Sequence, residues 1–193
     1  MSPRWKSLVV AVIILCIALA GLAALSFWRK ADMKKTEKAI DRINARHITL
    51  DDVMGKNLPP KPDQQLNDST VAGIDANNNA IRDDVELAIF AKYPNSAKIR
   101  AAMLQYAQAL QLELTEVFNS ASLISAVQKE NLAYKCVGDV NYEELDSNEK
   151  FLRNSILNNN LRNEKLNQVF EFLTGHGYKS GPNCDVDLST LVN

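Results

Sequence analysis

The sequence DANNNAIRDDVE at residues 75–86 decides how the chain is organised. Oxygen-bearing side chains stand at its first, third, fifth, ninth and twelfth positions, and an apolar pattern with helical spacing begins at Val85. Residues 64–74, which precede it, have no apolar period and contain Gly73. We therefore expect an anchor and a tether before this stretch and a helical domain after it.

This oxygen spacing is the one by which a twelve-residue loop wraps a calcium ion, with the last Glu reaching back from the first turn of a helix. The stretch resembles the EF-hand loop and, more closely, the thrombospondin type-3-like repeat, which reads Asp-x-Asp-x-Asp-Gly-[Ile/Val]-x-Asp-x-x-Glu. The resemblance covers these twelve residues only. It implies a Ca²⁺ site whose ligands are the side chains of Asp75, Asn77 and Asn79, the carbonyl of Ile81, Asp83 directly or through water, and a bidentate Glu86.

The loop departs from that pattern at its sixth position, where Ala80 replaces the usual Gly. Left-handed geometry at an L-residue costs roughly 1–2 kcal/mol, which would weaken a calcium site about tenfold or more. The alternative interpretation needs no ion. Asn79 or a neighbour would cap the helix, and the acidic residues that follow would favour its positive end.

The N-terminal segment predicts a membrane span. Residues 8–27 carry no charge, and about twenty such residues cross the hydrocarbon core as a helix. Trp5 and Trp28 flank the run at the positions of two interfaces, so we expect residues 8–28 to contact the membrane. Cleavage after residues 18–20, ALA, would instead release a secreted protein.

The two sides of the predicted span give conflicting signals on orientation. Positive charge alone would keep the domain in the cytoplasm, because four basic residues follow the span closely and two precede it. The calcium-type loop and a cysteine pair favour the opposite side. We therefore expect a single-pass protein of the inner membrane with its domain in the periplasm, and an anchored cytoplasmic domain without an ion is the alternative.

Composition divides the chain into five parts. These are an anchor (1–30), a helical stalk (31–56), a proline-rich linker (57–74), a helical domain that opens with the calcium-type loop (75–178), and an irregular tail (179–193). Three prolines between residues 59 and 62 resist helix and place the boundary between stalk and domain in the linker.

The domain reads as helical throughout. Ser96 caps a long helix whose apolar residues recur at three- and four-residue steps up to Phe118, and further helical patterns run to Leu173. Short connections favour antiparallel neighbours. The predicted fold is all-α, an N-terminal transmembrane helix followed by a bundle of about four to five helices.

Two of the three cysteines lie at predicted element ends. Cys136 is expected just after the third helix of the domain, and Cys184 lies in the tail. A disulfide between them would pin the tail and would require an oxidising compartment. Two buried thiols are the alternative. Cys16 falls within the predicted span and is expected to be a small apolar residue there.

Charge excludes one class of function. All 23 acidic residues lie beyond residue 30, together with 18 of the 22 basic ones, which leaves a net charge of −5 that does not suit a nucleic-acid binder. The whole chain resembles membrane-anchored proteins of gram-negative bacteria, a resemblance that implies no activity. We expect a protein-interaction or envelope-organising module. The alternative is a cell-envelope hydrolase that uses a carboxylate pair from Glu143, Glu144 and Glu149.

Overall fold

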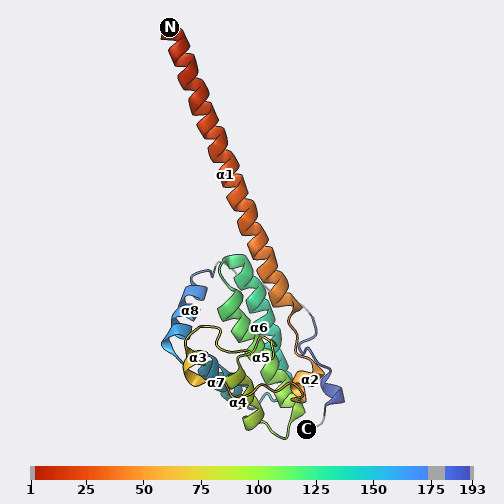
Figure 1. The fold of residues 1–193 in the computed structure, drawn as a ribbon. Coiled ribbons are helices and arrows are strands. Elements are labelled where there is room, and N and C mark those ends of the chain that lie inside the picture. Colours follow the sequence, from red (N-terminus) through yellow and green to blue (C-terminus); the bar gives the residue numbers. More distant parts are fainter. Residues whose placement is uncertain (1–2, 174–180, 192–193) are drawn as a thin grey trace. The chain divides into compact units, whose positions relative to one another are not determined.

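The computed structural model describes residues 3–173 and 181–191, and within these ranges it contains helices and no strands. The all-α prediction is therefore confirmed (Figure 1). In chain order the elements are α1 (Pro3–Ala45), α2 (Leu50–Val53), α3 (Gln64–Asp68), α4 (Asp83–Lys92), α5 (Ala97–Glu116), α6 (Ser120–Val140), α7 (Leu145–Ile156), α8 (Asn160–Phe170) and the 3₁₀ turn η1 (Leu188–Thr190).

The chain forms two compact units, one up to Lys38 and one from Ala39 onward. The first unit consists of the part of α1 up to Lys38, and its apolar residues from Ile13 to Met33 are all exposed. Ile14, Leu22 and Phe27, for example, are each more than 60% exposed. Exposed apolar surface of this extent is unfavourable in water, and α1 is long and apolar enough to cross a membrane.

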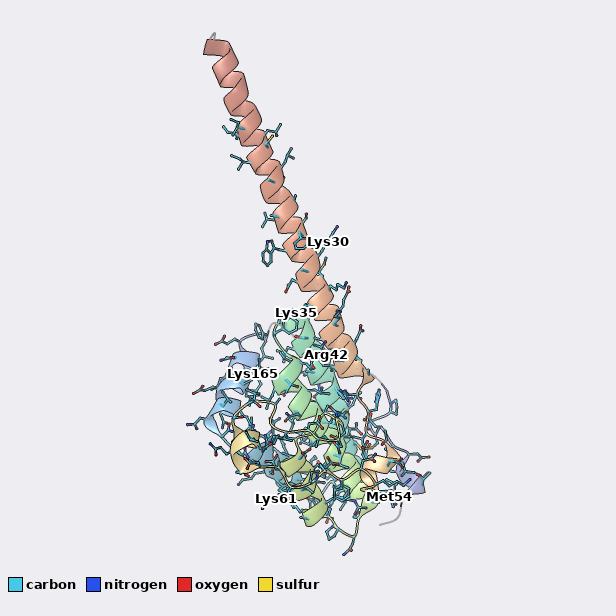
Figure 2. All side chains as sticks on the ribbon, in the orientation of Figure 1. Lys30, Lys35, Arg42, Met54, Lys61 and Lys165 are labelled. Carbon is cyan, nitrogen blue, oxygen red and sulfur yellow. A yellow bond between two sulfur atoms is a disulfide. The ribbon has the colours of Figure 1, made fainter. Side chains whose placement is uncertain are left out.

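The second unit begins inside the predicted stalk. Ala39 and Ile43, near the end of α1, are fully buried, and Ile43 packs with Val117 and Leu123. Arg42, which is labelled in Figure 2, reaches Glu116 at the end of α5, with 2.6 Å between guanidinium and carboxylate. Residues 31–56 were predicted to be a stalk. In the structure, the residues from 39 onward belong to the second unit.

Helix α5 lies at the centre of the second unit and packs against α2, α4, α6, α7 and α8 (Figure 1). Ser96 caps it by accepting a hydrogen bond from the Ile99 amide, as predicted from the sequence. Every residue from 100 to 114 is buried, on all sides of the helix. The polar side chains of a helix buried all round can find hydrogen-bond partners only inside the protein.

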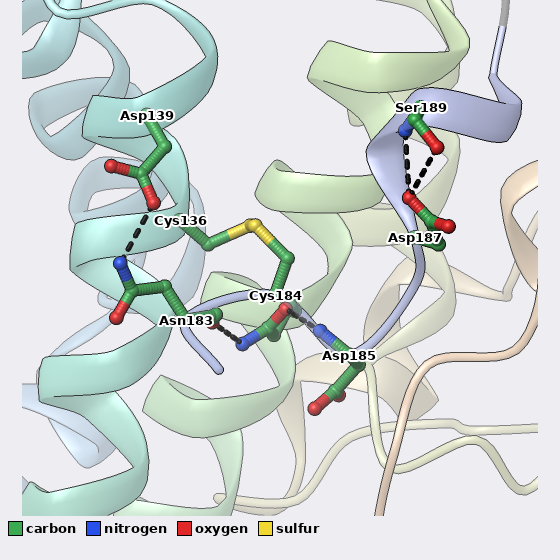
Figure 3. The surroundings of a disulfide bond; sticks show 8 residues. Cys136, Asp139, Asn183, Cys184, Asp185, Asp187 and Ser189 are labelled. Carbon is green, nitrogen blue, oxygen red and sulfur yellow. Dashed lines mark hydrogen bonds between the residues drawn. A yellow bond between two sulfur atoms is a disulfide. The ribbon is translucent and has the colours of Figure 1, made fainter. Parts of the chain in front are cut away.

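The tail is held against α5 and α6 (Figure 3). Cys184 is joined by a disulfide to Cys136, with the Cα atoms 5.0 Å apart. Cys136 lies within α6 and not after it, because the helix continues to Val140. Gln105 of α5 donates to the carbonyl of Asn183 and accepts from the amide of the residue after Cys184, both at 2.8 Å.

Candidate functional site

The loop of residues 75–86 is organised around the carboxylate of Asp75. Its oxygens accept hydrogen bonds from the amides of Asn79 at 3.1 Å and Ala80 at 2.9 Å, which closes the loop back on its first residue. Burial raises the pKa of Asp75, and these backbone hydrogen bonds and Arg46 oppose the rise. The first position of the predicted site is therefore half-buried at the inside of a tight turn.

Three of the predicted ligand residues converge at one point. The side-chain amides of Asn77 and Asn79 each lie 3.0 Å from Oε2 of Glu86, which projects from the first turn of α4. A half-turn of either amide about its terminal bond would present an oxygen where the nitrogen now lies. Burial raises the pKa of Glu86 to about 7, so removal from water disfavours its charge.

Asp83, at the ninth position, has one satisfied oxygen. Oδ1 accepts from the amide of Ala76 at 2.9 Å, whereas Oδ2 is buried and has no hydrogen-bond partner among the described residues. The residue is 1% exposed, and burial raises its pKa. A buried carboxylate oxygen without a donor is costly, so this atom can accept a further partner.

The backbone of the loop has left-handed geometry at two non-glycine residues, Asn78 with φ 57° and Ala80 with φ 64°. Asn tolerates this region better than Ala does. Because Ala80 already adopts the conformation in the folded chain, we expect its strain to lower the stability of the fold and to leave little for ion binding to overcome.

The capped-helix alternative requires a side-chain acceptor at the start of α4. Arg82 occupies that N-cap position. The Oδ1 of Asn79 instead accepts from the amide of Ile81 at 2.9 Å, inside the loop. Asp83 and Glu86 still stand in the first turn of α4, where carboxylates favour the positive end of the helix. The loop conformation therefore does not depend on capping by Asn79.

Sequence reasoning did not find the residues that connect this loop to the rest of the second unit. Arg82 is fully buried, pairs with Asp84 and donates to the carbonyls of Ser155 and Ile156 at the end of α7. Gln108 of α5 donates to the carbonyl of Asn79 at 2.7 Å. An arginine in a loop looks like a solvated residue in the sequence, and its distant carbonyl partners leave no local signal.

The donor set fits a hard divalent cation in chemistry. Ca²⁺ takes six to eight oxygen ligands from carboxylates, amide oxygens and carbonyls, and the loop offers all three kinds on the predicted residues. Among the described residues, no group of three or more His, Cys, Asp and Glu side chains is arranged to hold a metal by itself. A site here therefore needs the amide oxygens of Asn77 and Asn79 as well as Asp83 and Glu86.

In the part of the chain that the structure describes, the carboxylates proposed for hydrolysis do not gather around one cleft. Glu143 and Glu144 are exposed, and Glu149 pairs with Arg153 at 2.8 Å. Arg153 also binds Glu130, at 2.8 Å, and lies with Glu113 beside a cavity of about 10 Å³. Such a cavity holds about one water and cannot admit a sugar ring.

Comparison with known proteins gives no family for the chain. No family model, no curated protein and no solved structure matches it.

The cluster around Glu113 generates a pH-dependence prediction. Burial, and then the nearby Glu130, raise the pKa of Glu113 to about 7, whereas Arg153 opposes the rise. The folded state therefore binds this proton more tightly than the unfolded chain, so the free energy of unfolding should fall as pH rises from about 4.5 to about 7. Glu113→Gln should remove up to about 1.4 kcal/mol per pH unit of that fall.

Urea denaturation of the full chain in nanodiscs, with chelator present, measures this slope at a series of pH values. The exposed Glu143→Gln is the control and should keep the wild-type profile. Parallel profiles for Glu113→Gln and wild type between pH 5 and 8 would refute the assignment.

Proposed function

We propose that the chain is a single-pass protein of the inner membrane that holds its helical unit in the periplasm as a module for binding another protein or organising the envelope. The observation that supports this most is α1, a single helix that has exposed apolar residues between Ile13 and Met33 and buries Ala39 and Ile43 near its end in the second unit. A helix continuous across both parts couples a membrane-embedded segment to a folded body.

The cysteines support the periplasmic side. A disulfide between Cys136 and Cys184 closes a span of 48 residues and persists in an oxidising compartment. It holds a tail that also contributes Asp185, whose Oδ2 accepts from the amide of Ile48 at 3.0 Å. A reducing cytoplasm would break the disulfide and remove one of the links between the tail and α6.

We further propose that the loop of residues 75–86 binds Ca²⁺ as a structural ion. The ion would supply a positive charge and a partner for the buried Oδ2 of Asp83, which has no hydrogen-bond partner among the described residues. It would also offset the cost of burying the charge of Glu86. The loop is tied to the end of α1, where Arg46 donates to the carbonyl of Asn78 at 2.6 Å. An ion there would order the start of the helical domain and would act without a second conformation.

Calorimetry on the full chain in nanodiscs tests the ion. We expect heat on addition of calcium, and we expect Glu86→Gln to weaken binding at least about tenfold because it removes a bidentate carboxylate. Asp51→Asn, which alters an exposed carboxylate outside the loop, should bind like wild type. Absence of both heat and a thermal shift with calcium would rule out the ion.

Ala80→Gly should raise the free energy of unfolding by about 1 kcal/mol in the absence of calcium, because glycine adopts left-handed geometry without strain.

A topology experiment in cells tests the membrane arrangement. Alkaline phosphatase fused after residue 193 should be active, because that enzyme matures only outside the cytoplasm. In the unfused protein, a membrane-impermeant thiol reagent should label Cys184, the less buried partner of the disulfide, only after reduction. The intact mass should include residues 1–30, whereas loss of the first 20 residues would show secretion after cleavage. A free thiol at Cys184 together with an inactive fusion would place the domain in the cytoplasm and contradict the proposal.

A further inference from the structure

A pocket of about 380 Å³ lies beside the disulfide, between the end of α6 and the tail. Its size falls within the range of about 300–1,000 Å³ typical of small-molecule sites. Tyr134 and Tyr142 supply aromatic walls, and Asp139 and Asn183 supply planar polar groups joined by a 2.7 Å hydrogen bond (Figure 3). The pocket is contained entirely in the second unit.

The two tyrosines are in different environments. Tyr134 is half-buried and stacks edge-on against Tyr106 in the core, with ring centroids 5.9 Å apart. Tyr142 is 79% exposed, the most exposed of the large hydrophobic side chains in the described residues. Packing explains the position of Tyr134, whereas Tyr142 leaves most of its ring uncovered by the described residues.

Gly138 gives an independent observation on the floor of the pocket. It has ordinary helical backbone within α6, and a Cβ built there would meet only Leu145, at a comfortable 3.8 Å. Glycine weakens a helix interior relative to alanine. Neither backbone geometry nor close packing therefore requires glycine here, and its absent side chain leaves the floor clear.

The polar lining indicates the class of ligand. Lys135 and Asp139 contribute opposite charges, so the pocket carries little net charge and favours a neutral molecule. Carboxylate, amide and ammonium groups beside two aromatic faces match a ring that has apolar C–H faces and an edge of hydroxyl groups. We propose that this pocket binds a neutral saccharide, with Tyr142 as the stacking platform and Asp139 and Asn183 as hydrogen-bonding partners.

Saturation-transfer NMR tests the proposal with the full chain in phosphatidylcholine nanodiscs, prepared without glycosidic detergent. The probes are the trimer of N-acetylglucosamine, maltotriose and a tyrosine-containing pentapeptide, with empty nanodiscs as the blank. We expect transfer to at least one saccharide. Tyr142→Ala, which removes the platform, should weaken binding about fivefold or more, whereas Tyr142→Phe should stay within about twofold of wild type.

Gly138→Met separates a ligand role from a structural one. Methionine is a better helix former than glycine and would extend into the pocket, so the thermal midpoint should hold or rise while saccharide binding falls about fivefold or more. A lower midpoint with unchanged binding would show that Gly138 serves packing and would overturn the proposal. So would transfer to the pentapeptide alone, transfer to none of the probes, or equal binding by Tyr142→Ala.

Discussion

The second unit depends on the burial of α5 on all its sides. Three glutamines, Gln105, Gln108 and Gln111, follow one another at three-residue steps, and none is more than 4% exposed. Each donates its side-chain amide to a backbone carbonyl of an irregular segment, at 2.7–2.8 Å. A buried amide without a partner costs about 1–3 kcal/mol, so the burial of α5 and the placement of these segments require each other.

The acceptors lie in three separate parts of the chain: the tail at residue 183, the calcium-type loop at residue 79 and the linker at residue 72. Two buried arginines also connect two of these parts, the linker and the calcium-type loop, to helices other than α5. Arg162 of α8 donates to the carbonyls of Asn67 and Val71, and Arg82 joins the loop to the end of α7. The irregular segments therefore contact α5 through buried hydrogen bonds, and the helices around α5 complete the apolar core.

The sequence predicted the parts of the fold that rest on local pattern. The uncharged run of the first helix, the Ser96 cap and the apolar steps of α5 all concern neighbours within a few residues, and each appears where it was expected. Within residues 75–86 the backbone has Ala80 in left-handed geometry, and the resemblance of this stretch to a calcium-binding loop stays a prediction, as does the ion itself.

Other features required contacts across the chain. Ile43 looks like part of a weak stripe on a solvated stalk in the sequence, whereas in the structure it packs in one cluster with Val117 and Val169. In the sequence, the glutamines of α5 interrupt an apolar helix and look like an exposed edge. Their acceptors lie 29, 39 and 78 residues away, so no local pattern indicates that they are buried. The pocket near Gly138 likewise combines α6, the start of α7 and the tail. Only a structure brings such partners together.

Amide hydrogen exchange on the full chain in nanodiscs tests the role of the glutamines most directly, with Gln105→Leu, Gln108→Leu and Gln111→Leu compared one at a time. Each substitution should speed exchange about tenfold or more in its own segment, namely 183–188, 75–81 and 67–74 respectively, while α5 stays protected. Identical exchange in all three variants, or faster exchange spread evenly through α5, would contradict the account.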